Sequence, residues 1–142
     1  MLNKKNILLI GAGLLAVLLA ACNSGSSTST YQYLQVTPSV NPPVYMAKIG
    51  ESATMTFTNT IVSNAAPSFT QYNVAVTVPS SAFTVLTESG NNGCMYIKTN
   101  QSCSIQISFT PSQASDYQAI NSIQFTVGTL ESTVNVATVP NP

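Results

Sequence analysis

The sequence predicts an all-β protein, an antiparallel β-sandwich of about seven to nine strands that follows a cleaved signal peptide. Three observations lead to this prediction. After residue 30 the chain repeatedly alternates apolar and polar residues, the pattern of half-buried strands. Pro, Gly and Asn interrupt the alternation at short intervals, as turns do. Beyond Cys22 no stretch has a convincing 3.6-residue apolar period, so we expect no helix except one turn within 112–119.

The first 21 residues have the features of an export signal. Lys4 and Lys5 form a positively charged start, and residues 7–21 are apolar or small. This run is shorter than the roughly 20 residues that a permanent membrane-spanning helix needs, and small residues end it. We therefore expect residues 1–21 to be removed, with a permanent transmembrane anchor as the competing interpretation.

The run ends in Leu19-Ala20-Ala21-Cys22, which resembles the lipobox of bacterial lipoproteins at all four positions. The resemblance implies that Cys22 receives a lipid and becomes the new N-terminus. Two or three acyl chains make a stable anchor, because each buried methylene contributes about 0.8 kcal/mol. Asn23 follows the cysteine, where an Asp would imply retention in the inner membrane. We therefore expect a lipid-anchored outer-membrane protein, on the periplasmic face rather than the cell surface.

Residues 22–30 join this anchor to the domain. After Cys22 the segment contains only Asn, Ser, Gly and Thr, so it offers no apolar side chain to bury. A flexible chain of eight such residues has an r.m.s. reach of roughly 16 Å. We expect a flexible linker that keeps the domain close to the membrane.

Residues 31–142 contain the expected strands, which lie at 31–37, 44–49, 52–61, 72–78, 82–86, 94–97, 102–110, 120–127 and 132–139. The alternation is strongest at 102–110, where Cys103, Ile105, Ile107 and Phe109 point inward. Gly128 and Thr129 form a two-residue hairpin turn between the last two strands. Short strands that are half polar and half apolar, in a domain of about 110 residues, predict two sheets packed face to face. An immunoglobulin-like sandwich has this size, and a small barrel is the alternative fold.

The cysteines predict a disulfide. With Cys22 lipidated, Cys94 and Cys103 remain as a pair in an oxidising compartment. Two cysteines without any histidine cannot complete a tetrahedral metal shell, and a redox pair prefers the Cys-X-X-Cys spacing. We expect a structural disulfide that joins two neighbouring strands and contributes about 2.5–3 kcal/mol.

The segment from Cys94 through Cys103-Ser-Ile-Gln-Ile-Ser-Phe-Thr-Pro to Tyr117 resembles the sandwich domains of the ASPM–SPD-2–Hydin and choice-of-anchor type. The run ending in Thr-Phe-Thr-Asn-Thr at residue 60 is similar to their early strand. The chain departs from the family at Ser115-Asp116, where a glycine often precedes the tyrosine. The resemblance implies an immunoglobulin-like module for contacts between proteins, with no catalytic residues.

Composition excludes several functions. Charged residues make up 6% of the chain, against about a quarter in typical domains. The mature chain has two lysines against four carboxylates, too few cations for nucleic acid. It has no histidine, and its carboxylates (Glu51, Glu88, Asp116 and Glu131) are scattered. We therefore expect no catalytic residues, no metal site and no cofactor.

We expect a non-enzymatic lipoprotein that contacts other envelope proteins, as a structural or accessory subunit of an assembly such as a secretion or pilus machine. The alternative is a surface-exposed lipoprotein that contacts proteins or glycans of host or neighbouring cells. For the alternative, five tyrosines offer rings for stacking on sugars, although we expect them to be half-buried in strands. They are Tyr31, Tyr33, Tyr45, Tyr72 and Tyr96.

Overall fold

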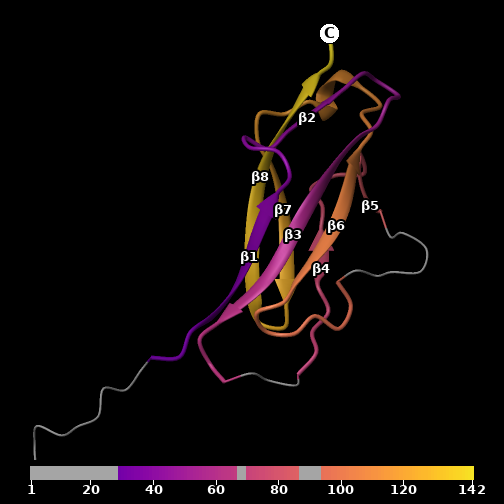
Figure 1. The fold of residues 1–142 in the computed structure, drawn as a ribbon. Coiled ribbons are helices and arrows are strands. Elements are labelled where there is room, and N and C mark those ends of the chain that lie inside the picture. The colour runs from indigo at the N-terminus through magenta and orange to yellow at the C-terminus, as the bar shows by residue number, and fades with distance from the viewer. Residues whose placement is uncertain (1–28, 67–69, 87–93) are drawn as a thin grey trace, which may run out of the picture.

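The computed structural model describes residues 29–66, 70–86 and 94–142. Within this part, eight strands and one short 3₁₀ turn form two four-stranded sheets that pack face to face (Figure 1). The expected signal peptide, Cys22, most of the linker and the turn at 88–93 lie outside the described residues. The predicted β-sandwich is confirmed, and two separate sheets replace the competing barrel.

The first sheet has the order β1-β3-β6-β5, with all neighbours antiparallel. Its strands are β1 (Gln32–Pro38), β3 (Ala53–Ser63), β6 (Ser102–Phe109) and β5 (Phe83–Leu86). The alternation in β3 and β6 predicts which side chains enter the core: Met55, Phe57, Ile107 and Phe109 are all buried.

The second sheet has the order β2-β8-β7-β4. Its strands are β2 (Val44–Ala47), β8 (Leu130–Pro140), β7 (Asn121–Val127) and β4 (Ala75–Thr77). The hairpin between β7 and β8 turns at Gly128, whose φ of 58° is the left-handed conformation that glycine adopts without strain. The expectation of purely antiparallel pairing is wrong for β2, which runs parallel to β8. The chain crosses from β1 to the second sheet through 39–43 without reversing its direction, so β2 meets β8 in the parallel sense (Figure 1).

Two other expectations at the strand level need correction. The expected strand at 94–97 is absent: only Ile97 forms a bridge, to Tyr72, and the backbone of Tyr96 is left-handed with φ of 67°. The run 72–78 pairs as a strand only over Ala75–Thr77. The helical turn expected within 112–119 is confirmed as the 3₁₀ turn η1 (Ala114–Asp116).

This strand order is that of an immunoglobulin-like domain. The order β1-β3-β6-β5 corresponds to immunoglobulin strands A-B-E-D, and β4, β7 and β8 correspond to C, F and G. In antibody domains a disulfide joins strands B and F across the core. Here Phe57 of β3 packs against Phe125 of β7 at a ring-centroid distance of 5.3 Å. An aromatic contact thus joins the two sheets here, and it contributes about 0.5–1.5 kcal/mol in addition to the free energy of burying the two rings.

Tyr45 joins the two sheets near the end where β2 lies. Its hydroxyl donates a hydrogen bond to the Ile107 carbonyl of the opposite sheet at 3.0 Å, and its ring packs against Phe83 and Phe109. Burial raises the pKa of the Tyr45 hydroxyl above its usual range, so the group stays protonated and able to donate. Tyr117 makes a similar contact, donating to the Ala47 carbonyl at 2.9 Å.

Candidate interaction surfaces

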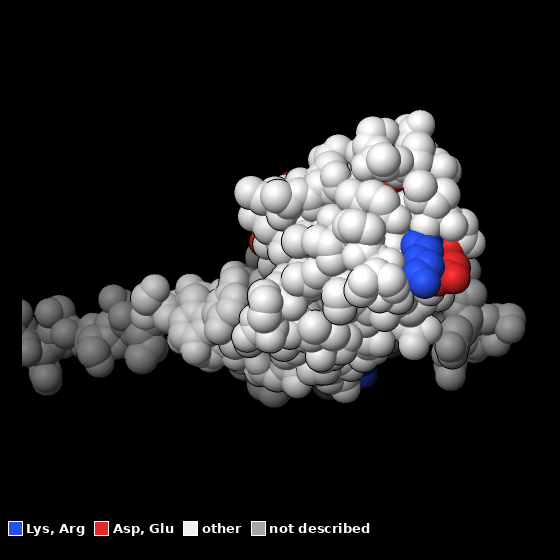
Figure 2. Space-filling view, turned by 90° about the horizontal axis from the view of Figure 1, so that it is seen from above, with Lys and Arg blue, Asp and Glu red and all other residues white. Residues whose placement is uncertain are grey.

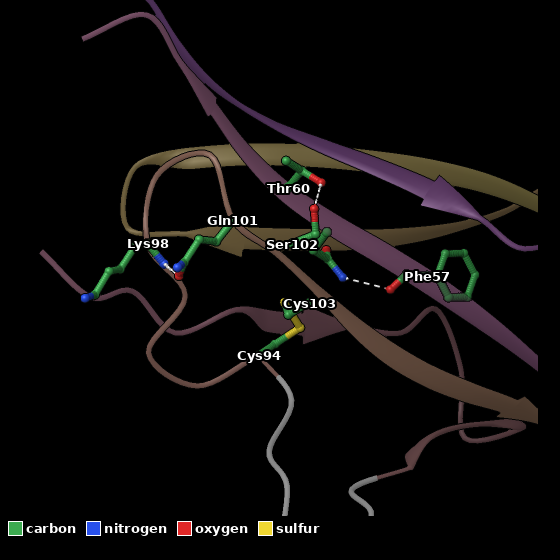
Figure 3. Close-up of a disulfide and its surroundings, with 8 residues drawn as sticks. Phe57, Thr60, Cys94, Lys98, Gln101, Ser102 and Cys103 are labelled. Carbon is green, nitrogen blue, oxygen red and sulfur yellow. Dashed lines mark hydrogen bonds between the residues drawn. A yellow bond between two sulfur atoms is a disulfide. The ribbon is translucent and has the colours of Figure 1, made fainter. Parts of the chain in front are cut away.

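The disulfide is the sequence-predicted site that the structure describes. Cys94 and Cys103 are bonded, with their Cα atoms 5.1 Å apart, and both residues are buried (Figure 3). The expectation that it joins two strands is corrected: Cys103 belongs to β6, whereas Cys94 lies in the irregular segment before it. The bond holds this segment, including exposed Tyr96, against the sheet.

Next to the disulfide the core contains an unsatisfied polar atom. Asn59 lies opposite Cys103 in the ladder between β3 and β6 and is fully buried. Its Nδ2 donates to the Phe57 carbonyl at 3.1 Å (Figure 3), but its Oδ1 has no hydrogen-bond partner among the described residues. A buried acceptor without a partner costs about 1–3 kcal/mol, so we treat Asn59 as a weak point of the core.

The domain has two ends with different surroundings (Figure 1). The described chain begins at one end, which we call the proximal end, and the β7–β8 hairpin and the start of the loop after β3 lie at the same end. The C-terminus, β2 and the turn η1 lie at the opposite, distal end.

A cluster of apolar side chains lies on the outer face of the second sheet at the distal end. Alternation along β2 and β8 points Tyr45, Val136 and Thr138 into the core, and therefore points their neighbours outward. The outward residues, which we call the distal apolar surface, are Val44, Met46, Ile120, Ala137 and Val139.

The register brings the residues of β2 and β8 in this surface side by side, and Ile120 lies directly before β7, the next strand. Val44 is paired with Ala137 and Met46 with Val139, and Ile120 comes directly before Asn121, the partner of Val136. Met46 is 56% exposed and Ile120 is 67% exposed. Apolar side chains that gather on one exposed face are typical of contact sites, whereas single exposed apolar residues are ordinary.

The rest of that face is polar. Ser122 donates to Asn135 at 2.8 Å. Farther along β7 and β8 the outward residues are Ser122, Gln124, Thr126, Glu131, Thr133 and Asn135. Thus the apolar character is confined to the distal half of the sheet. The view onto the distal end shows a surface almost entirely of uncharged residues, with small charged areas toward its rim (Figure 2).

The outer face of the first sheet carries hydroxyl and amide groups. Thr54, Thr56, Thr58 and Thr60 follow one another along β3, opposite Ser108, Gln106, Ser104 and Ser102 of β6. Thr60 and Ser102 are hydrogen-bonded at 2.7 Å (Figure 3). We call this the hydroxyl face; none of its paired residues in β3 and β6 is charged.

The tyrosines divide into two groups. Tyr45 is buried and Tyr72 is half-buried, as expected for residues packed in strands. Tyr31, Tyr33 and Tyr96 are exposed, so the expectation of half-burial is wrong for them. Tyr31 and Tyr33 lie side by side at the proximal end, with ring centroids 6.1 Å apart.

The carboxylate of Asp116 serves the local fold. It accepts hydrogen bonds from the backbone N–H groups of Ser112 and Gln113 and from the Ser112 hydroxyl. The bond from the Ser112 N–H, with the others, lowers the pKa of Asp116. In the described ranges no group of three or more acidic, His or Cys side chains is placed to hold a metal ion. Over the same ranges, no helix is long and apolar enough to cross a bilayer.

Sequence reasoning did not identify the distal apolar surface, although a signal for it was present. Val44 to Ala47 is a run of four apolar residues, which breaks the alternation of a strand that is polar on one side. Such a run requires cover on both faces or an exposed apolar face. In β2 the outward pair, Val44 and Met46, has no covering layer among the described residues.

The fold and these surfaces define a small immunoglobulin-like domain with an exposed apolar surface. The sequence matches no protein-family profile and no curated protein. Among solved structures, it is similar to part of a family 123 glycoside hydrolase from Clostridium perfringens, at 13% identity and a TM-score of 0.51. That match covers 75% of this chain and 27% of the hydrolase chain, and at this identity it shows the fold alone.

Two further matches have lower TM-scores. Domains 1–6 of the surface layer protein SbsC match at 17% identity and a TM-score of 0.46, over 79% of this chain and 14% of that one. The BIgI domain of the beta protein from S. agalactiae, solved bound to CEACAM1, matches at 12% identity and a TM-score of 0.39. That match covers 77% of this chain and 99% of the BIgI chain. These scores are too low to establish a shared fold, and we draw no functional conclusion from them.

Proposed function

We propose that this protein is a non-enzymatic bacterial lipoprotein, held at the outer membrane by lipid on Cys22. In this proposal its immunoglobulin-like domain binds other envelope proteins, as a structural or accessory subunit of an assembly such as a secretion or pilus machine. The observation that carries the proposal is the distal apolar surface, which lies at the end of the domain opposite the linker.

The arrangement of anchor and surface supports this function. A lipid on Cys22 and a linker of eight residues keep the proximal end near the bilayer, so the distal end faces away from it. The partner we expect has an apolar contact patch of its own, since Met46 and Ile120 offer no charge for a polar partner to pair with. Full burial of an Ile or Met side chain contributes about 1.5–3 kcal/mol, so these two residues can dominate such a contact.

The test is recovery of the tagged protein after crosslinking in cells, comparing Ile120→Asp with the unchanged chain. A buried unpaired carboxylate in the contact weakens binding by about 2 kcal/mol or more, which is at least a roughly 30-fold loss of affinity. Because Ile120 is 67% exposed in the free domain, this change leaves the fold and its stability nearly unaffected.

Thr133→Asp is the matched control, because Thr133 is exposed on the polar half of the same sheet face. We expect it to recover the same envelope proteins as the unchanged chain. A Cys22→Ser form is expected to be mislocalised and to lose them. Equal recovery by the Ile120 and Thr133 variants would contradict the assignment of the distal surface, and recovery of the protein alone would contradict the assembly.

The alternative function is that of a surface-exposed lipoprotein that contacts proteins or glycans of other cells. The exposed pair Tyr31 and Tyr33, next to the uncharged hydroxyl face, is the observation that favours it. Protease treatment of intact cells separates the two functions. A surface-exposed lipoprotein is expected to be cleaved in intact cells. A protein that is protected in intact cells, and is cleaved only after the outer membrane is opened, supports the periplasmic assembly.

A further inference from the structure

The exposed tyrosine pair lies where the linker enters the domain. Tyr33 lies in β1 and Tyr31 comes directly before this strand, and their rings lie side by side with centroids 6.1 Å apart. They are 53% and 49% exposed, with their rings inclined by 30°. Each of these rings thus presents an apolar body and a polar hydroxyl at the proximal end of the domain.

The backbone at this point is held in place. The Oδ1 of Asn64 accepts a hydrogen bond from the Tyr31 N–H at 2.7 Å, and the Asn64 N–H donates to the Tyr31 carbonyl at 3.3 Å. The Nδ2 of Asn64 also donates to the Ser29 carbonyl at 2.9 Å. The chain is therefore fixed to the loop after β3 up to residue 29, and the tyrosines have a set position relative to the linker.

The length of the linker limits how far this pair can lie from the anchored cysteine. Because the chain is held from Ser29 onward, six free residues lie between Cys22 and the domain, and they span at most roughly 22 Å when extended and about 14 Å on average. The polar headgroup layer on each side of a bilayer is about 5–8 Å thick. At this average distance the two tyrosines can reach the headgroup layer. The proximal end is the only end of the domain that the linker holds close enough to contact it.

The chemistry of this end suits a lipid surface. Tyrosine and tryptophan are enriched at membrane–water interfaces, because the ring enters the apolar boundary while the hydroxyl remains hydrated. Strands β1 and β3, which form this edge of the sheet, contain no charged residue. Approach to the bilayer therefore removes no charge of these two strands from water. Glu131, directly after the β7–β8 hairpin at the same end, is exposed, and in this orientation its carboxylate stays hydrated.

We propose that Tyr31 and Tyr33 lie in the headgroup region of the membrane to which Cys22 is anchored, and that they fix the orientation of the domain. This inference rests on the proposed lipid anchor and adds a second contact to it. The distal apolar surface is then held away from the bilayer at a set angle rather than moving freely on the linker. A lipid surface fits better than a glycan because the pair lies at the entry of the linker and not within the hydroxyl face.

The absence of tryptophan from the sequence allows a direct test. Tyr33→Trp and, as the matched control, Ile120→Trp each place one tryptophan at a known end of the domain. The mature chain is coupled through Cys22, the one cysteine outside the disulfide, to a maleimide lipid and reconstituted in vesicles of phosphatidylethanolamine and phosphatidylglycerol with brominated phosphatidylcholine. We expect several-fold stronger quenching, and bluer emission, at position 33 than at position 120.

Equal quenching at the two positions would overturn the inference. A response at position 33 to added soluble polysaccharide, without quenching by brominated lipid, would also overturn it and favour the glycan function. The chemical tether makes this outcome independent of lipidation in the cell. The proposed anchor is tested separately by the mass of the N-terminal peptide from cells, which is expected to begin at a lipid-modified Cys22.

Discussion

The disulfide allows a stability prediction whose size follows from the structure. The bond joins residues nine positions apart, Cys94 and Cys103. In the chain-entropy relation, a closed loop of this size removes about 8.7 cal/mol/K from the unfolded chain, or about 2.6 kcal/mol at 25 °C. For a domain whose total stability is about 5–15 kcal/mol, reduction removes a substantial share but does not unfold it.

The assay is urea unfolding followed by far-ultraviolet circular dichroism, with and without reductant, in a Cys22→Ser form that has no other thiol to exchange. A loss of about 2.6 kcal/mol corresponds to a midpoint lower by about 1–2.5 M urea. The Cys94→Ala, Cys103→Ala double variant is expected to lose about 1 kcal/mol more, because both sulfur atoms are buried and their removal leaves a cavity. An unchanged urea midpoint after reduction would refute the reasoning. Complete unfolding on reduction would also contradict the calculated loss, because it would mean that the disulfide stabilises the domain by far more than the entropy of its own loop.

Three further predictions concern single side chains, and the first two use the same urea assay. Tyr45→Phe is expected to lower stability by about 1–1.5 kcal/mol, because it removes only the hydrogen bond to the Ile107 carbonyl; no change would mean that this bond adds nothing. Asn59→Leu is expected to raise stability by about 1–2 kcal/mol, because it removes a buried oxygen without a partner; a loss would indicate that the oxygen is satisfied by water. Hydrogen bonds to the Asp116 carboxylate, first that from the Ser112 N–H, lower its pKa in the folded state. The ionised carboxylate therefore stabilises the fold at pH values above its unfolded pKa of 3.8, and this stabilisation is lost as the pH falls through the folded-state pKa. The stability difference between the unchanged chain and Asp116→Asn should therefore shrink in thermal unfolding as pH falls below about 4, and a difference that grows in acid would contradict this.

The parts of the fold that sequence predicts well are those with a strict two-residue period. In β6 and most of β3 every second residue is apolar, and a slip of one residue would turn these side chains to the solvent. The Gly128-Thr129 turn is equally specific, because a two-residue connection with Gly first fits the twist of a hairpin. These local rules hold because one face of each strand must be buried.

Other features depend on partners distant in the sequence. Nothing within Val44–Ala47 indicates that β2 pairs in parallel with the last strand of the chain. The Cys94 segment has apolar residues suited to a strand, but the disulfide and the left-handed Tyr96 hold it in an irregular conformation. Asn59 is placed inward by the alternation of β3 although a polar side chain is costly there, and local pattern cannot say whether it finds a hydrogen-bond partner.

The candidate surfaces show the same division. Alternation predicts the hydroxyl face, since the outward residues where β3 pairs with β6 are all polar. It cannot predict the distal apolar surface, because Met46, Val139 and Ile120 come from three separate strands or strand ends and meet only after the sheet is assembled. Exposure of Tyr33 instead follows from alternation along β1, in which the neighbouring Leu34 is buried.

The central claim is that the distal apolar surface binds another envelope protein while Cys22 anchors the chain. The most direct measurement places a photo-crosslinking amino acid at position 120, and at position 133 as control, in the lipidated protein in living cells. We predict that position 120 captures one reproducible envelope protein and that position 133 does not. No crosslink at position 120, or the same weak set of products at both positions, would contradict the claim.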